Sequence, residues 1–118
     1  MAAKDELGRR GEVLAVAHLE EEGLDGVGRN WRCRLGEIDV IARDGGQLVF
    51  VEVKTRSSVA FGTPLDAITL GKLARLRRLA AAWCAENRAN CDRIRIDAIG
   101  IVVPNWGPVQ IDHLKNVS

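Results

Sequence analysis

The sequence predicts an α/β fold in which a mixed β-sheet is flanked by helices. Two long stretches carry apolar residues at helical spacing, and the residues between them form short alternating runs separated by turns, as strands do. Two more strand-like runs follow the second helix, and a helical crossover allows a parallel strand pair in the same sheet. The predicted order is helix 5–22, strand 25–32, a hairpin over 36–54, helix 69–86, and strands 93–103 and 109–114.

Length and composition indicate one globular domain over residues 1–118, since 47% of the residues are hydrophobic. The net charge of +1 excludes a global attraction to polyanions, so any nucleic-acid affinity must come from local clusters. Cys33, Cys84 and Cys91 are odd in number, widely spaced and lack a CxxC pair, which predicts reduced thiols and argues against a zinc site. No secretory signal or membrane-length apolar run is present, so we expect a cytoplasmic protein without membrane contact.

In the first helix, Asp5 is the expected N-cap and Gly23 the expected stop. Glu12 is unusual because its neighbours at helical spacing are small or apolar: Gly8, Ala15, Val16 and Leu19. Such a carboxylate lies either at the edge of the buried face or in a site. We expect His18, further along the same helix, to be structural or exposed.

The hairpin over 36–54 is the most informative stretch. Gly45-Gly46 supplies the positive φ angles of a tight turn, which places Asp39 opposite Glu52 and Glu37 opposite Lys54. Period-2 alternation gathers these four charged residues on one face. The other face is apolar and consists of Ile38, Val40, Ala42, Val49, Val51 and Val53.

Directly opposed carboxylates destabilise a sheet, and a divalent cation between Asp39 and Glu52 would remove their repulsion. Mg²⁺ typically binds one or two carboxylates together with substrate phosphate oxygens. The alternative is a solvated charged face with Glu37–Lys54 as a cross-strand ion pair. Both interpretations remain open at the level of the residues alone.

The second helix carries an apolar arc, with Leu70, Leu73, Leu76, Leu79, Ala80 and Trp83. Lys72, Arg75 and Arg78 form a basic band on the solvent side, which is either a solvated face or a phosphate contact. The loop 57–66 before the helix is expected to border a cleft. Among the last strands, 93–103 is expected to be buried, with Asp97 in a supporting structural role, and 109–114 is expected at an edge.

A helical Glu followed by Asp and Glu-x-Lys on adjacent strands resembles the PD-(D/E)xK nuclease superfamily, with its restriction endonuclease-like αβββαβ core. The set Glu12, Asp39, Glu52 and Lys54 is similar to that of archaeal Holliday-junction resolvases. The sequence as a whole resembles the YraN-like family of small uncharacterised bacterial proteins more closely still. The matching stretches cover nearly the whole chain: 8–12, 30–32, 36–44, 49–56, 61–62 and 95–97. Leu73 stands where this family often has a glutamine.

The resemblance implies a Mg²⁺- or Mn²⁺-dependent endonuclease acting on nucleic acid, with structured DNA favoured. Asp39, Glu52 and the backbone carbonyl of Val53 would bind the metal, with Glu12 completing the site and Lys54 positioning water or stabilising charge on the phosphate. Arg56 and the basic band would hold the phosphate backbone. Related resolvases are dimers, which leaves a homodimer open. The alternatives are an inactive nucleic-acid-binding module on the same fold and a protein-interaction domain that binds neither metal nor nucleic acid.

Overall fold

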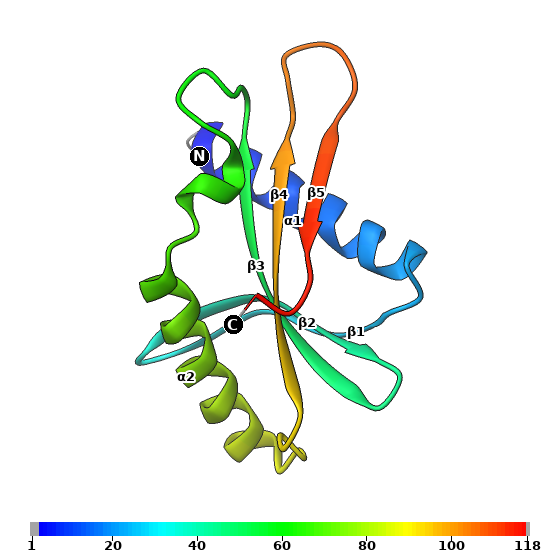
Figure 1. Ribbon diagram of the computed structural model, residues 1–118, viewed down its shortest axis with the longest axis vertical. Helices are drawn as coiled ribbons and strands as arrows, with labels where there is room; N and C mark the ends of the chain where they lie inside the picture. Colours follow the sequence, from blue (N-terminus) through cyan, green and yellow to red (C-terminus); the bar gives the residue numbers. More distant parts are fainter. Residues whose placement is uncertain (1–2, 118) are drawn as a thin grey trace.

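The computed structural model describes residues 3–117 and confirms the predicted α/β class (Figure 1). The elements are α1 (Ala3–Glu21), β1 (Asp25–Cys33), β2 (Gly36–Asp44), β3 (Gln47–Arg56), the 3₁₀ helix η1 (Pro64–Ala67), α2 (Leu70–Asn87), β4 (Ile94–Val102) and β5 (Gln110–Leu114). Asp5 lies inside α1 instead of capping it. Thr69 caps α2, because its side chain accepts a hydrogen bond from the Lys72 amide at 3.2 Å. None of the helices in the described part of the chain is long and apolar enough to cross a membrane.

The five strands form one sheet in the order β1-β2-β3-β4-β5. β3 and β4 run parallel, and the other neighbouring strands run antiparallel, so the sheet is mixed as predicted. The parallel pair is possible because α2 carries the chain back between the two strands. β5 lies at an edge, again as predicted.

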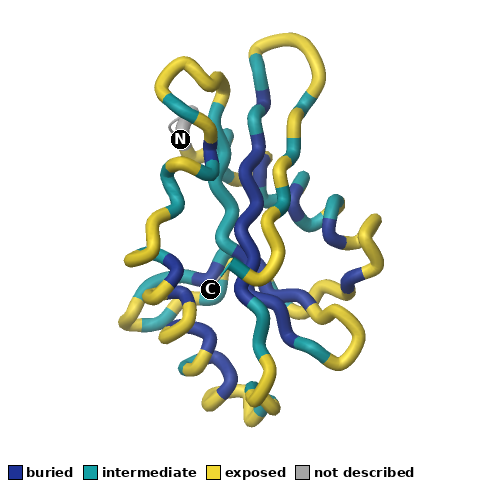
Figure 2. Tube along the Cα trace, in the orientation of Figure 1, coloured by how far each residue is buried: buried dark blue, intermediate teal, exposed yellow. Residues whose placement is uncertain are grey.

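Each face of the sheet has its own apolar core. The core on the α2 side contains Ile38, Ile41, Leu48, Phe50 and Ile96 of the sheet with Leu73, Leu76, Leu79, Ala80 and Trp83 of the helix. The core on the α1 side contains Val40, Ala42, Val49, Val51, Ile99 and Ile101 with Ala15 and Leu19 of α1. Figure 2 shows that the buried residues (dark blue) run along the middle of the sheet. Leu70, predicted in the apolar arc, is 84% exposed because it opens the helix beyond the sheet contact.

The hairpin has the predicted register from Asp44↔Gln47 to Val40↔Val51, and there the ladder ends. The direct pairs predicted beyond it, Asp39 with Glu52 and Glu37 with Lys54, do not form. Gly45 has the expected positive φ of 61°, whereas Gly46 does not. Figure 1 shows β2 running away toward the β1–β2 turn (cyan) while β3 continues in another direction.

The Asp39 side chain replaces a backbone partner where the β2–β3 ladder ends. Asp39 Oδ2 accepts a hydrogen bond from the Val53 amide at 2.9 Å. Ile38 packs in the α2-side core with Ile41, whereas Val40 packs on the α1 side. Strict alternation is therefore broken at Asp39, and the prediction that Ile38 shares a face with Val40 is wrong.

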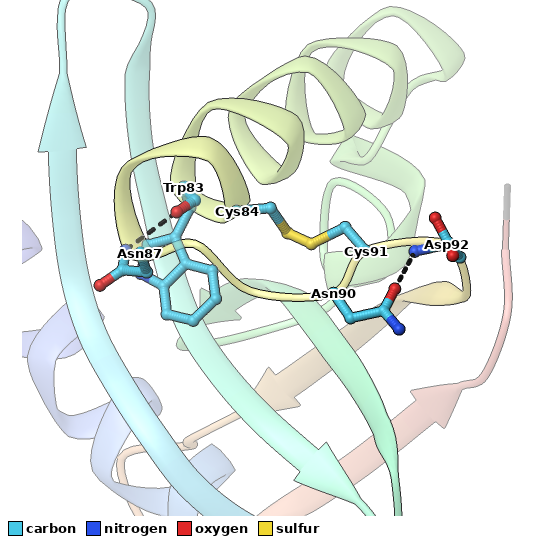
Figure 3. Close-up of a disulfide and its surroundings, with 6 residues drawn as sticks. All are labelled: Trp83, Cys84, Asn87, Asn90, Cys91 and Asp92. Carbon is cyan, nitrogen blue, oxygen red and sulfur yellow. Dashed lines mark hydrogen bonds between the residues drawn. A yellow bond between two sulfur atoms is a disulfide. The ribbon is translucent and has the colours of Figure 1, made fainter.

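Cys84 and Cys91 form a disulfide at the end of α2 (Figure 3). The prediction of three reduced thiols is therefore wrong for this pair, while Cys33 is a free thiol. The helix ends at Arg88 in the left-handed conformation, and the Ala89 amide donates to the Cys84 carbonyl at 3.0 Å. This reversal brings the two Cα atoms to 6.1 Å, a proximity that the sequence spacing alone does not reveal.

Candidate metal and nucleic-acid site

A close contact between α1 and β3 places Glu12. Gly11 is buried against Thr55, and a Cβ atom at Gly11 would lie 1.8 Å from the Thr55 hydroxyl oxygen. Only glycine allows the helix to approach the strand this closely. Glu12 and Lys54, the sequence neighbours of this contact, consequently border the same cleft of about 820 Å³.

This cleft lies where β2 and β3 have separated, so α1 and the strands all contribute to its walls. Its lining also includes Arg9 of α1, Asn30 and Arg32 of β1, and Glu37 of β2. Asn30 has a φ of 52°, a left-handed conformation that asparagine tolerates better than most residues. Its side chain hydrogen-bonds to Glu12. The irregular backbone of β1 thus supports the helical acid.

A second, smaller cavity of about 250 Å³ brings Asp39 of β2 and Glu52 of β3 together with Lys72 and Arg75 of α2. Glu37 borders both this cavity and the larger cleft, so the two adjoin. The structure therefore gathers the four predicted site side chains at one region, although not through the direct cross-strand pairs that the sequence predicts.

The electrostatics of this region favour protonation of its acids. Burial and then the negative charge of Glu52 raise the pKa of Asp39 to about 7, with Glu12 adding to the effect and the Val53 amide opposing it. Burial also raises the pKa of Glu52, against the positive charges of Lys72, Arg75 and Lys54. The pKa of Glu12 is likewise raised by burial. The acids are close enough to repel one another, and cations surround them.

Glu37 belongs to the acidic region, although the sequence assigned it no catalytic or metal role. Its charge raises the pKa of Glu12, Asp39 and Glu52. Its side chain accepts a hydrogen bond from Arg32 of β1, so its partner is not the Lys54 of the predicted alternative. The available signal was its place on the predicted acidic face, two residues before Asp39.

The predicted phosphate-binding residues divide into two groups. Lys72 and Arg75 border the acidic cavity, and Lys72 is half-buried, with its ammonium donating to the Ala67 carbonyl at 3.0 Å. Lys72 therefore does not belong to a solvent-side band. Arg56 and Arg78 border neither cavity. The Arg56 Nε is buried without a hydrogen-bond partner among the described residues, and Arg78 is exposed.

Asp97 and Leu73 lie outside the acidic region. Asp97 is fully buried on β4 and is held by Arg95, His113 and the Asn116 amide, which confirms its predicted structural role. Leu73 is buried in the α2-side core. The position where the resembling family often has a glutamine therefore provides apolar packing and no polar group.

The raised pKa of Asp39 predicts a stability that depends on pH. Because folding raises this pKa from its ordinary value to about 7, Asp39 favours the folded state most at low pH, and this contribution is lost as pH rises through 7. Without divalent metal, we expect the free energy of unfolding to fall by at most about 3 kcal/mol from this residue between about pH 5 and pH 8.5. Urea denaturation at both pH values measures the change.

Asp39→Asn is the matched variant for that prediction, because an amide oxygen can still accept from the Val53 amide. This variant should show little of the fall in the free energy of unfolding with rising pH, and it should be more stable than the wild type at pH 8.5. A variant less stable than the wild type at pH 8.5 would contradict the electrostatic assignment.

The fold and the site together define a class: an α/β protein with a half-buried carboxylate cluster, faced by cations, where two strands of a mixed sheet separate. Within that class, residues 11–101 match the uncharacterised protein family UPF0102, and the chain belongs to this family, the YraN-like group that the sequence resembles. The chain is 55% identical to a UPF0102 protein of Beutenbergia cavernae over the whole of both chains. It is 52% identical to one of Leifsonia xyli, with 99% of each chain covered, and 49% identical to one of an Arthrobacter species, with 100% of each covered.

Proposed function

We propose that this protein is a metal-dependent nuclease of the PD-(D/E)xK type that hydrolyses phosphodiester bonds, with structured DNA as its substrate. One observation carries the proposal: Asp39 and Glu52 are brought to a single cavity where burial and mutual repulsion disfavour their charged forms. An arrangement of this kind is unfavourable unless a proton or a cation occupies it. Raised pKa values with specific charge partners in a cavity also mark functional sites more often than structural ones.

The donor set fits Mg²⁺ or Mn²⁺, which prefer carboxylate and carbonyl oxygens. Asp39 uses Oδ2 for the Val53 amide and keeps Oδ1 for a metal. Glu52 would be the second ligand, the Val53 carbonyl the third, and Glu12 would join from the adjoining cleft. When bound, the ion would act as a Lewis acid and lower the pKa of a coordinated water.

The surrounding cations would act on the substrate. Lys54 borders the cleft together with Glu12, where its ammonium would orient water or stabilise negative charge on the phosphate. Lys72 and Arg75 flank the acids and would hold phosphate oxygens, with Arg56 and Arg78 as outlying contacts. Contacts to the backbone position a nucleic acid without reading its bases, so we expect recognition of shape over sequence.

A second candidate is a nucleic-acid-binding module on this fold that does not cleave. The buried Leu73 favours it, because this position then offers no polar group beside Lys72. The two candidates share metal and nucleic-acid binding and differ only in turnover.

Two measurements test the proposal. The first titrates Mn²⁺ against the wild type and Asp39→Asn, with melting temperature as the readout. Mn²⁺ should stabilise the wild type and have little effect on Asp39→Asn, whereas Asp112→Asn on the exposed part of β5 should respond as the wild type does. The second incubates the wild type with branched, flapped, duplex and single-stranded DNA and RNA in Mg²⁺ or Mn²⁺.

Metal-dependent cleavage of a branched or flapped DNA supports the nuclease. Salt-sensitive binding without cleavage supports the second candidate. A protein that neither responds to Mn²⁺ nor retains nucleic acid at low salt is a protein-interaction domain, and both proposals are then wrong.

A further inference from the structure

We propose that the protein has a second metal site, for Zn²⁺ or a similar transition metal, formed by His18 of α1, Glu22 directly after that helix and His113 of β5. One ligand atom from each of the three residues lies within 4.8 Å of the other two. His18 and Glu22 are four residues apart, and the Glu22 amide donates to the His18 carbonyl at 3.0 Å, which continues the helical turn. Their side chains therefore share a face, as helical positions i and i+4 do.

The separations of the ligand atoms are close to those that zinc requires. His18 Nε2 lies 3.1 Å from His113 Nδ1 and 3.9 Å from a Glu22 carboxylate oxygen. With zinc–nitrogen bonds of 2.0–2.1 Å, a tetrahedral site places two nitrogens about 3.3–3.4 Å apart. Small side-chain movements would therefore admit the ion in place of the contact between the two rings.

A buried carboxylate orients His113 for this role. His113 Nε2 lies 2.8 Å from Asp97 Oδ2. Because an ionised carboxylate only accepts hydrogen bonds, Nε2 is assigned the proton, and the lone pair of Nδ1 faces His18. A carboxylate behind a histidine in this manner is the usual support of a zinc-binding imidazole.

Asp97 is itself held firmly. The Arg95 guanidinium donates to both of its oxygens, at 2.9 Å and 3.0 Å, and the Asn116 amide donates to Oδ1 at 3.0 Å. Asp97 has no exposed surface. The supporting carboxylate is therefore fixed by contacts that do not depend on a metal, so the orientation of His113 is present before an ion binds.

This site is separate from the acidic region. His18, Glu22 and His113 line neither the cleft that contains Glu12 and Lys54 nor the cavity that contains Asp39 and Glu52. Imidazole nitrogens favour zinc over magnesium, so the two sites would select different ions. The sequence argument against zinc rested on the lack of a CxxC pair. The two histidine ligands proposed here are 95 residues apart in the chain, so no local spacing could reveal them.

The ion would fasten the end of α1 to the edge strand β5, and the fourth position would hold water. Edge strands have a hydrogen-bonded neighbour on one side only. The metal would therefore stabilise a strand that is otherwise weakly held. The nuclease proposal plays no part in this inference.

The experiment uses the untagged full chain with Asp39→Asn, which removes a ligand of the acidic region. Calorimetric titration with Zn²⁺ should give one ion per chain and a higher melting temperature, and Co²⁺ should show the visible absorption of a tetrahedral site. A large excess of Mg²⁺ should not displace either ion. His18→Gln and Glu22→Gln should each weaken Zn²⁺ binding at least about 10-fold, whereas the exposed neighbour Glu21→Gln should leave it unchanged.

Failure to bind Zn²⁺ in the Asp39→Asn protein overturns the proposal. The same follows if His18→Gln and Glu22→Gln bind as tightly as Glu21→Gln, because the ion then lies elsewhere. Neither result bears on cleavage, since the ligands differ from those of the acidic region. A failed nuclease assay likewise leaves this test intact.

Discussion

Lys54→Ala should lower the rate of metal-dependent cleavage by roughly 10²–10³-fold, the usual cost of removing one group that stabilises transition-state charge. Lys54 lies at the end of β3 in the cleft that Glu12 also borders, and it is two residues from Glu52. Its loss leaves Asp39 and Glu52 in place. Stabilisation by Mn²⁺ should therefore persist while turnover is lost. Single-turnover cleavage of a branched substrate, measured beside an Mn²⁺ melting titration, separates the two effects.

Lys115→Ala is the matched control. Lys115 is exposed just beyond β5, and its substitution removes the same positive charge from the chain. It should cleave as the wild type does. Lys54→Arg should recover part of the activity if positive charge is what the position supplies. Equal cleavage by Lys54→Ala and the wild type would exclude Lys54 from the reaction.

Asp97→Asn should destabilise the fold by about 3–5 kcal/mol, because it leaves the Arg95 charge without its buried partner. Asparagine also places an NH2 group where one of the two carboxylate oxygens accepts hydrogen bonds, so the donors that face this position lose their acceptor. Asp44→Asn is the control, since it removes the other carboxylate on the same guanidinium from a side chain that is 45% exposed. That change should cost about 1 kcal/mol or less. Urea denaturation near pH 7 compares the two.

The stability difference between the wild type and Asp97→Asn should also depend on pH. Burial acts to raise the pKa of Asp97, but hydrogen bonds from Arg95, the Asn116 amide and His113 outweigh it and hold the pKa below its ordinary value. The stabilising contribution of Asp97 is therefore complete above about pH 4 and is lost as pH falls through the folded-state pKa. The stability gap between the wild type and Asp97→Asn should narrow on acidification. A gap that is constant down to about pH 2 would show that the charge of Asp97 is not the cause.

Most of the fold followed from local patterns. The helix around Leu73 and Leu76, the strand around Ile99 and the edge position of 109–114 are all as predicted, because apolar spacing differs between helix and strand and is written directly in the chain. The hairpin register was predictable for a similar reason, since a short turn ties together residues only a few positions apart.

The errors occur where a side-chain contact or an irregular backbone interrupts a regular pattern, and where distant elements meet. The end of the β2–β3 ladder at Val40 depends on the Asp39 side chain bonding the Val53 amide, and a regular alternation cannot anticipate such a bond. The Cys84–Cys91 pair depends on the left-handed residue that ends α2. The meeting of His18 with His113 depends on how α1 lies across the sheet.

By itself, the sequence determined the class of fold, the order of its elements and the residue types of the acidic site, because these depend on spacings of a few residues. Only the tertiary structure decided that Glu12 reaches the same cleft as Lys54, that Lys72 turns toward the acids and that Glu37 joins them. The physical reason is the packing of elements far apart in the chain. The contact of Gly11 with Thr55 brings α1 to β3, and no single stretch of residues encodes such a contact between the first helix and the third strand.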